Sequence, residues 1–228
     1  MLGPTELKKK AAGEKAVDYI KDDMTIGLGS GSTVYWMMKK LGQLVEQGLN
    51  IKGVPSSVRT EGWAKEFGIP LVYFSEVSRL DLAIDGADEV EPQFNLVKGG
   101  GGSLYREKVV DAAADQLIII VDDSKLVQTL GVYPLPVEVV PFGWEMTARK
   151  IEKLGAQLGL RKKEGNIYVS NNGNYILDCK FPSIKAPELL HKELKQMLGV
   201  VETGLFVKMT DIVIVGEEQG CKVLTKKN

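Results

Sequence analysis

Residues 81–110 read DLAIDGADEVEPQFNLVKGGGGSLYREKVV, a stretch that gathers several side chains able to do chemistry. Asp85 and Asp88 end an apolar run with only two small residues between them. Two carboxylates so close can enter one pocket and transfer protons between neighbouring hydroxyls of a substrate. The alternative is an Asp-Gly turn with solvated acids. Glu89 and Glu91, which continue the acidic run, are expected to be solvated.

The same stretch then supplies a cation, a bare backbone and one more carboxylate. Lys98 precedes Gly99, Gly100, Gly101 and a fourth glycine, whose ordering costs conformational entropy. Such a run is tolerated where backbone lies against a ligand or where a loop must stay mobile. Lys98 is either a structural ion-pair partner or a cation that stabilises developing negative charge. Glu107 falls in the early turns of a predicted helix, as a base or as a surface acid favoured by the helix dipole.

A second stretch, GLGSGSTVYWMM, runs from a predicted strand through a Gly/Ser loop into a helix expected to start near Thr33. Glycines let backbone approach a ligand, and a helix start presents unpaired N–H groups at a positive dipole end. The hydroxyls of Ser30, Ser32 and Thr33 add donors around Gly31, so the loop suits a phosphate. A plain strand-to-helix turn is the alternative. The loop matches neither a Walker A loop nor the dinucleotide fingerprint.

These loops need a scaffold, and the first 130 residues predict one. Short β-like runs (MTIGL, IKGV, PLVYF, DLAID, QLIIIVDD) alternate with segments of helical spacing. This alternation predicts an α/β fold with a mostly parallel sheet covered on both faces, in which ligands bind beyond the carboxyl ends of the strands. The two loops should therefore share one edge, and Lys125, just past another predicted strand, should lie at the same edge.

After residue 131 the sequence pattern predicts a smaller α+β domain. Three prolines punctuate a crossing segment, WEMTARKIEKLG and APELLHKELKQML predict helices, and NIYVSNNGNYILDCKF predicts two strands joined by an NNG turn. The tail DIVIVGEEQGCKVLTK reads as core strand that returns to the first domain. The expected division is 1–131 plus 208–228 for the larger domain and 132–207 for the smaller.

Composition narrows the chemistry. Lys plus Arg total 29 and Asp plus Glu total 30, which gives no global attraction to nucleic acid or to an anionic membrane. Two cysteines and one histidine argue against a zinc site and against a histidine-based triad. That histidine, His191, is expected on the solvent face of its helix. Acid–base work therefore falls to carboxylates and lysines, which points to proton transfer on a small phosphorylated sugar or polyol without a metal or cofactor.

The predicted location is the cytosol. No segment approaches the roughly 20 apolar residues of a membrane span, and MLGPTELKKKAAGEKAVDYI lacks the apolar stretch of a signal peptide.

Three segments of the sequence resemble those of a known family. GLGSGST, DGADEVEPQFNLVKGGGGSLYREKVV and VDDSKLVQTLGVYPLPVEVVPF resemble, in order and spacing, the signature blocks of the type A ribose-5-phosphate isomerases, and NNGNYILDCKF and VVETGLF extend the likeness. The resemblance implies interconversion of ribose 5-phosphate and ribulose 5-phosphate, without metal, in the non-oxidative pentose phosphate pathway. It also implies a Rossmann-like domain with a smaller ferredoxin-like one, assembled as a homodimer or homotetramer.

Carried over position by position, the resemblance assigns roles. Glu107 is implied as the base that moves a proton between C2 and C1 through an enediolate, and Lys98 as the cation that stabilises the enediolate oxygen. Asp85 and Asp88 are implied to transfer hydroxyl protons and to open the furanose ring. The resemblance does not assign ring opening to one of the two. The implied substrate- and phosphate-binding residues are Ser30, Gly31, Ser32, Thr33, Asp85, Gly86, Ala87, Asp88, Lys98, Gly99, Gly100, Gly101 and Lys125.

Two other functions remain as alternatives. A non-catalytic sugar-phosphate sensor would keep the phosphate loop without needing a base at Glu107. A dinucleotide-dependent dehydrogenase is disfavoured, because Ser32 stands where the third glycine of the fingerprint belongs.

Overall fold

The computed structural model describes residues 2–226, which form two compact units. The first unit runs to Ala87, resumes from Arg106 to Leu126, and takes up the chain again from Met209. The second unit consists of Asp88–Tyr105 and Val127–Lys208. Among the described residues, no helix is both long and apolar enough to cross a bilayer.

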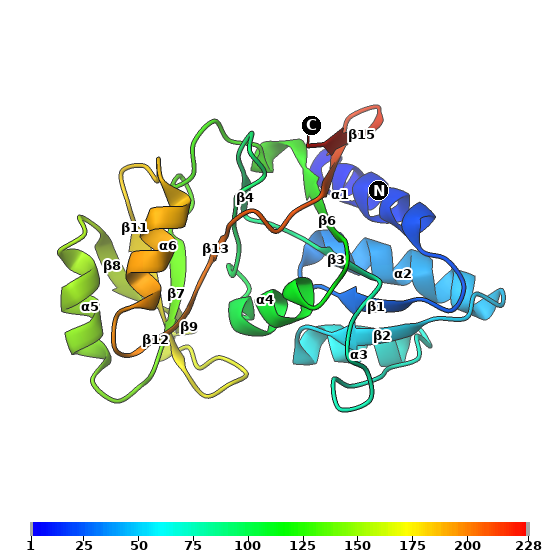
Figure 1. Ribbon diagram of the computed structural model, residues 1–228. Coiled ribbons are helices and arrows are strands. Elements are labelled where there is room, and N and C mark those ends of the chain that lie inside the picture. The colour runs from blue at the N-terminus through cyan, green and yellow to red at the C-terminus, as the bar shows by residue number, and fades with distance from the viewer. Residues whose placement is uncertain (1, 227–228) are drawn as a thin grey trace. The chain divides into compact units, whose positions relative to one another are not determined.

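The first unit is built on a six-stranded sheet with the order β15-β14-β6-β3-β1-β2 (Figure 1). Five strands are parallel and β15 is antiparallel to β14. The strands are β1 (Thr25–Leu28), β2 (Lys52–Pro55), β3 (Leu82–Asp85), β6 (Leu117–Asp122), β14 (Ile212–Glu217) and β15 (Gly220–Thr225). The helices are α1 (Pro4–Ala16), α2 (Ser32–Glu46), α3 (Val58–Glu66) and, from Arg106 onward, α4 (Leu104–Ala112), with 3-10 turns at Val17–Tyr19 and Asp123–Lys125. The predicted α/β class with a mostly parallel sheet is confirmed.

Both faces of this sheet are covered, as the apolar runs predict. Ile26 and Leu28 join a core with side chains of α1 and α2, whereas Gly27 between them faces the opposite side. There a Cβ on Gly27 would lie 2.5 Å from Val110 of α4, so only glycine lets this helix approach the strand.

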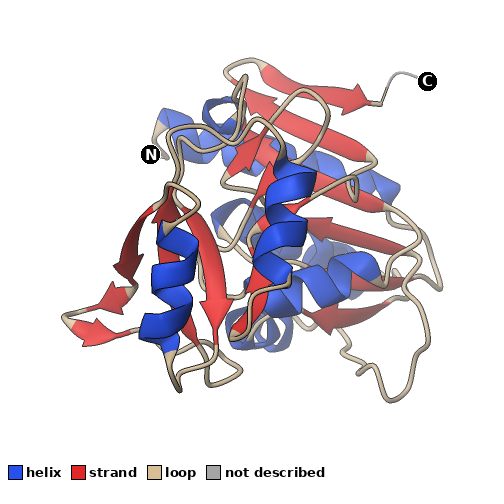
Figure 2. Cartoon of the chain, turned by 60° about the vertical axis from the view of Figure 1, so that its left-hand side comes forward, coloured by secondary structure: helices blue, strands red, loops and turns tan. Residues whose placement is uncertain are grey.

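The second unit contains a four-stranded antiparallel sheet with the order β12-β7-β11-β8. Figure 2 draws the strands of the protein in red and the helices in blue. In chain order its elements are β7 (Leu135–Val139), α5 (Trp144–Glu152), β8 (Gln157–Leu160), β11 (Tyr175–Lys180), α6 (Pro187–Lys195) and β12 (Val200–Thr203). Alternate residues of β7 and β11, such as Val137 and Leu177, share a core with Ile151 of α5 and Leu194 of α6. Both helices therefore cover the same face, and Asp178, between Leu177 and Cys179 in β11, lies on the other face.

Two smaller sheets complete this unit. β4 (Glu89–Val90), β5 (Leu96–Val97) and β13 (Leu205–Phe206) pair as an antiparallel sheet in the order β13-β5-β4, and β9 (Lys162–Lys163) pairs with β10 (Asn166–Ile167). The pairing of β4 and β5 with β13 places residues 88–105 in the second unit. The compact units differ from the expected division, which placed residues 88–105 in the larger domain and began the smaller one at 132; that division stays a prediction.

Two expected strands differ from the structure. PLVYF does not form a strand: Leu71 makes a single bridge to Gly53, and Tyr73 and Phe74 beyond it are 54% and 40% exposed. The run therefore leaves the sheet after Leu71. In NIYVSNNGNYILDCKF the first half pairs with β9, and only Val169 bridges Tyr175 across the NNG turn.

A buried glutamate explains the shape of that turn. Glu138 of β7 is fully buried, and its Oε1 accepts hydrogen bonds from Ser170 (2.8 Å), Asn172 (3.2 Å) and Asn174 (2.9 Å). These bonds draw the turn toward β7 and away from a regular hairpin.

The expectation that His191 lies on the solvent face of its helix was wrong. Its ring is half-buried, with Nδ1 2.8 Å from Oγ1 of Thr203.

Candidate active site

The carboxyl ends of three neighbouring strands carry the predicted loops of the first unit. β6, β3 and β1 are adjacent and parallel, so Gly29–Thr33, Asp85–Ala87 and Asp123–Lys125 follow their strands at one edge (Figure 1). Lys125 is half-buried in the 3-10 turn directly after β6. The sheet thus gives Lys125 the predicted place along the edge.

The Gly/Ser loop ends in a helix start without a side-chain cap. Gly31 is the N-terminal flanking residue of α2, with φ of +129°, a conformation that favours glycine. α2 begins at Ser32, one residue before the expected start, and its first turn contains no acidic residue. Its first N–H groups have no partner within the helix. This end of α2, with Thr33 nine-tenths buried beside it, is suited to an anion.

Asp85 ties this loop to the neighbouring strand. Its carboxylate is fully buried, and Oδ1 accepts the backbone N–H groups of Ser30 (2.8 Å) and Gly86 (2.7 Å). Hydrogen bonds from N–H groups to an ionised carboxylate are short and strong. The structure therefore brings two predicted residues, Ser30 and Asp85, into direct contact.

Two hydroxyls that the sequence reasoning missed brace the same loop. Ser30 Oγ lies 2.5 Å from Ser57 Oγ and 3.0 Å from Thr60 Oγ1, and Thr60 Oγ1 also donates to the carbonyl of Gly29 (2.7 Å). Thr60 is fully buried, and Ser57 caps α3 by accepting the N–H of Thr60. The signal was present in SSVRT, which follows β2 at the edge already occupied by β1.

Glu107 lies on α4, in the part of that helix that belongs to the first unit. Its side chain is 4% exposed and it stands in the first turn, where the helix dipole favours a carboxylate. The reading of Glu107 as a surface acid is therefore excluded by its burial. The first unit also contains Asp85, Gly86 and Ala87, whereas Asp88 belongs to the second unit.

The second unit holds the remaining predicted residues. Asp88 is half-buried, and its Oδ2 accepts the N–H of Gly100 at 2.7 Å. Lys98 is 2% exposed, with its ammonium 5.2 Å from the centre of the Phe206 ring and its backbone N–H donating to Gly204 at 2.8 Å. A buried ammonium over an aromatic face is a strong local positive charge.

Glu89 and Glu91 contradict the expectation of solvated acids. Glu89 is 2% exposed and accepts the backbone N–H groups of Gly131 (2.7 Å) and Tyr133 (2.5 Å). Glu91 is 6% exposed and accepts the backbone and side-chain N–H groups of Asn95. Both carboxylates are buried because backbone donors in nearby loops pair with them. Glu89 thereby holds the segment that carries Tyr133.

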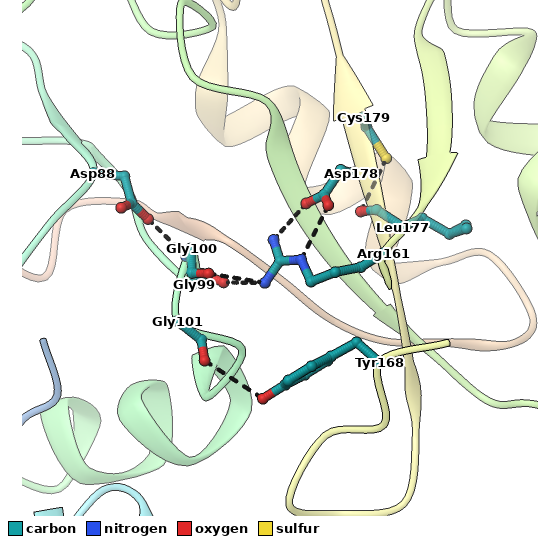
Figure 3. Close-up of polar contacts among 9 residues, drawn as sticks. All are labelled: Asp88, Gly99, Gly100, Gly101, Arg161, Tyr168, Leu177, Asp178 and Cys179. Atoms are coloured by element: carbon teal, nitrogen blue, oxygen red, sulfur yellow. Dashed lines mark hydrogen bonds and ion pairs between the residues drawn. The ribbon is translucent and has the colours of Figure 1, made fainter. Parts of the chain in front are cut away.

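Arg161 and Tyr133 are further polar residues that the sequence did not indicate. Figure 3 shows Arg161 between the carboxylate of Asp178 and the carbonyl groups of Gly99 and Gly100. Burial lowers the pKa of the Arg161 guanidinium, but the hydrogen bond and charge of Asp178 outweigh it and leave that pKa above its ordinary value. Burial, and secondarily the charge of Asp88, raises the pKa of the Tyr133 hydroxyl. Both groups therefore keep their protons at neutral pH.

No cluster of three or more His, Cys, Asp or Glu side chains with the arrangement of a metal site occurs in residues 2–226. The acidic residues at the edge of the first sheet instead accept backbone N–H groups or, as for Asp123, pair with a lysine: Lys8 Nζ donates to Asp123 Oδ2 at 2.7 Å. Metal independence is a separate question, which chelation tests.

Comparison with known proteins identifies the family of this chain. The family model described as ribose 5-phosphate isomerase A (phosphoriboisomerase A) matches residues 52–220. Ribose-5-phosphate isomerase A 1 of Oceanobacillus iheyensis is 56% identical over 211 residues, covering 92% of this chain and 94% of the relative. Ribose-5-phosphate isomerase A of Listeria innocua is 48% identical over 221 residues, covering 96% and 99%.

Solved structures agree. A D-ribose-5-phosphate isomerase in complex with phospho-erythronic acid superposes with a TM-score of 0.95 at 40% identity, covering 97% of this chain and 99% of that one. Ribose 5-phosphate isomerase from Plasmodium falciparum superposes with a TM-score of 0.94 at 37% identity, covering 98% and 100%.

Proposed function

This chain belongs to the ribose-5-phosphate isomerase A family, its activity is that of a ribose-5-phosphate isomerase of the pentose phosphate pathway, and we propose that it works by metal-independent proton transfer through an enediolate. The near full-length relation to that family carries the conclusion. The described residues add support, because carboxylates, a buried lysine and an uncapped helix start are the groups that this reaction needs.

The phosphate is proposed to bind at the start of α2. Backbone N–H groups around Gly31, Ser32 and Thr33 meet the negative charge at the positive end of the helix. The hydroxyl of Ser30 contributes one more donor, and Lys125 a positive charge. Because Asp85 and Thr60 hold Ser30 and Gly29, the loop keeps its shape before the substrate arrives.

The proton transfers are proposed as follows. Asp85 and Asp88 move protons between the anomeric hydroxyl and the ring oxygen, which breaks the C1–O bond of the furanose ring and gives the open-chain aldehyde. Glu107 then removes the proton from C2, whose electron pair forms the C1–C2 double bond of the enediolate. Lys98 stabilises the oxyanion on O1, which takes up a proton as O2 loses one. Return of the carbon-bound proton from Glu107 to C1 gives the ketose.

The substrate class is supported by the ligand of a solved relative. That protein binds phospho-erythronic acid, which carries a phosphate and a planar carboxylate. A phosphorylated enediolate has the same two anionic ends. Phospho-erythronic acid is therefore expected to bind this chain and to compete with ribose 5-phosphate.

Finer descriptions of the molecule are also proposals. The βαββαβ order of the second unit, with strand order β12-β7-β11-β8, supports the name ferredoxin-like, and the parallel sheet of the first unit supports Rossmann-like. Assembly as a homodimer or homotetramer is supported by exposed apolar side chains, among them Phe142 at 95% and Leu198 at 85%. A cytoplasmic location and the domain division at 131 and 208 stay predictions.

The test is turnover of ribose 5-phosphate in the presence of EDTA by the native protein, by Glu107→Gln and by Glu145→Gln. Glu145 is a matched control, because it is an exposed glutamate in the first turn of α5, which like α4 has nine residues. The native protein and Glu145→Gln should turn over without metal, and Glu107→Gln should lose at least about 10²-fold in kcat.

Each other outcome has a meaning. Full turnover by Glu107→Gln would leave the isomerase in place and move the base to an aspartate. Loss of turnover on chelation would contradict metal independence. No turnover by the folded native protein, with ribose 5-phosphate still bound, would favour a sugar-phosphate sensor.

A further inference from the structure

The four glycines after Lys98 form a tight turn whose carbonyl groups are held by another segment of the same unit. The N–H of Gly102 donates to the carbonyl of Gly99 at 2.9 Å, and Gly99 and Gly102 have φ of +101° and +84°. Glycine adopts many backbone conformations, so one conformation persists only where outside contacts select it. Figure 3 shows those contacts: Arg161 reaches two carbonyl groups of the turn and Tyr168 reaches a third.

Arg161 uses both edges of its guanidinium group. Nη1 donates to the carbonyl oxygens of Gly99 at 2.8 Å and Gly100 at 3.2 Å. Nε donates to Asp178 Oδ2 at 3.0 Å and Nη2 to Asp178 Oδ1, so the carboxylate fixes the plane of the guanidinium. The Arg161 side chain is only 12% exposed, and its backbone N–H donates to Ile176 of β11 at 2.8 Å. The Arg161–Asp178 pair, called the clamp below, is therefore held by strand β11 of the four-stranded sheet.

Holding those carbonyl groups also sets the direction of the N–H groups. In a planar trans peptide, the C=O and the following N–H point in opposite directions. With the carbonyls of Gly99 and Gly100 turned toward Arg161, the N–H groups of Gly100 and Gly101 point away from it. The N–H of Gly100 does so and meets Asp88 Oδ2 at 2.7 Å. Arg161 thus acts on Asp88 through one peptide group.

The space around Gly100 makes this coupling tight. A Cβ on Gly100 would lie 2.6 Å from the Tyr133 hydroxyl and 2.7 Å from Asp88 Oδ1, so both side chains pack directly against the turn. A rotation of the Gly99–Gly100 peptide would both break the bond to Asp88 and push against these two groups. The position of Asp88 therefore depends on the conformation that Arg161 selects.

We propose that Arg161, oriented by Asp178, is a positioning residue of the isomerase reaction, which fixes the Gly99–Gly102 turn so that Gly100 holds Asp88 and Gly101 presents its N–H to a substrate oxygen. This inference rests on the proposed function, in which Asp88 transfers hydroxyl protons. Tyr168, whose hydroxyl donates to Gly101 at 3.4 Å, makes the weaker contact of the two.

The experiment compares Arg161→Gln with Arg79→Gln. Arg79 is the matched control, because it also pairs with an aspartate, Asp115 at 2.7 Å, but is 69% exposed and lies in the first unit. Three quantities are measured for each protein: kcat and KM for ribose 5-phosphate, the thermal midpoint, and amide hydrogen exchange of peptides covering residues 98–104. The NH₂ group of glutamine has two N–H donors, too few to bind two carbonyl groups and both oxygens of a carboxylate together.

The expected result is a split between the kinetic constants. In Arg161→Gln, kcat falls about 10- to 100-fold because Asp88 is misplaced. KM changes by less than about threefold because the phosphate loop is intact. Amide hydrogen exchange in the Gly99–Gly102 turn becomes faster. Arg79→Gln leaves all of these at native values. A role in stability alone would lower the thermal midpoint and leave kcat of the folded protein unchanged, and that result would overturn the proposal, as would unchanged exchange.

A second variant covers a failure to fold. Asp178→Asn keeps the guanidinium but releases its plane, and it should lower kcat and raise exchange in the same direction by a smaller factor; native kcat in this variant would overturn the proposal. If the native protein does not isomerise ribose 5-phosphate, the proposed function fails by itself. Amide hydrogen exchange of residues 98–104 then tests the clamp by itself. Faster exchange in Arg161→Gln than in the native protein and Arg79→Gln would support it, and equal exchange in all three proteins would overturn it.

Discussion

Gly29 is the position where one added methyl group should do most damage to the phosphate loop. It lies between β1 and Ser30, its N–H donates to Ile84 of β3 at 3.0 Å, and its φ is not positive. The requirement for glycine is therefore steric. A Cβ at this position would lie 2.5 Å from Cα of Asp85 and closer still to the Asp85 carboxyl group.

The magnitude of Gly29→Ala follows from these contacts. Carbon atoms pack at about 3.5–4.0 Å, so strand β3 and the loop must separate by about 1 Å. Overpacking of this kind costs about 1–3 kcal/mol, and loss of the bond from Ser30 N–H to the Asp85 carboxylate adds about 1.5–3 kcal/mol. Together they predict a loss of about 2.5–6 kcal/mol in unfolding free energy. For a chain of 228 residues this lowers the thermal midpoint by about 5–24 °C.

The assay pairs Gly29→Ala with Gly62→Ala. Gly62 is exposed in the interior of α3, and a Cβ there meets none of the described atoms within 4 Å. Alanine at this helical position should raise the unfolding free energy by about 0.5–1 kcal/mol. Activity should fall at least about 10²-fold in Gly29→Ala, through displacement of Ser30 and Asp85, and stay native in Gly62→Ala. A Gly29→Ala protein with native midpoint and native kcat/KM would refute the described packing of the loop.

Two further predictions concern a buried hydroxyl and a buried thiol. Thr60→Val removes the donor to the Gly29 carbonyl and should cost about 1–3 kcal/mol of unfolding free energy and raise KM for ribose 5-phosphate. Thr147→Val removes a half-buried bond to the Leu198 carbonyl and should lower stability without changing KM. Equal KM in the two variants would argue against a bracing role of Thr60. Burial raises the pKa of the Cys179 thiol, so the folded chain keeps a proton that the unfolded chain loses above about pH 8.5. The unfolding free energy should therefore fall as pH rises from about 8 to 10, and Cys179→Ala should flatten that slope in urea titrations, while an unchanged slope would contradict the burial.

The sequence could predict the parts of the site that depend on local chemistry. The parallel sheet, the loop at Ser30 and the strand end at Asp85 each combine an apolar run with Gly or Asp, and the period of the run sets which side chains are buried. The edge shared by these loops follows from parallel strands alone. Burial of Glu107 did not follow, because a first-turn glutamate has the same sequence signature whether exposed or buried.

The missed features depend on contacts between distant segments. β4, β5 and β13 have two residues each, too short for any periodicity, and they form because backbone groups near Val97 and Leu205 pair across more than a hundred positions. Arg161 contacts the glycine turn across 61 and 62 positions, and nothing in GLRKKEG distinguishes it from a solvated arginine. Burial of Glu89 likewise depends on donors more than forty residues away.

Transfer of the proton between C2 and C1 by a protein carboxylate is tested by running the isomerisation of ribose 5-phosphate in D₂O with EDTA and following C1 of the ribulose 5-phosphate by NMR over many turnovers. We expect deuterium at C1, because the protonated base exchanges with solvent, and we expect isomerisation and incorporation to slow together by at least about 10²-fold in Glu107→Gln. Rapid isomerisation with no deuterium at C1 would contradict transfer by an exchanging carboxylate and would indicate direct hydride transfer.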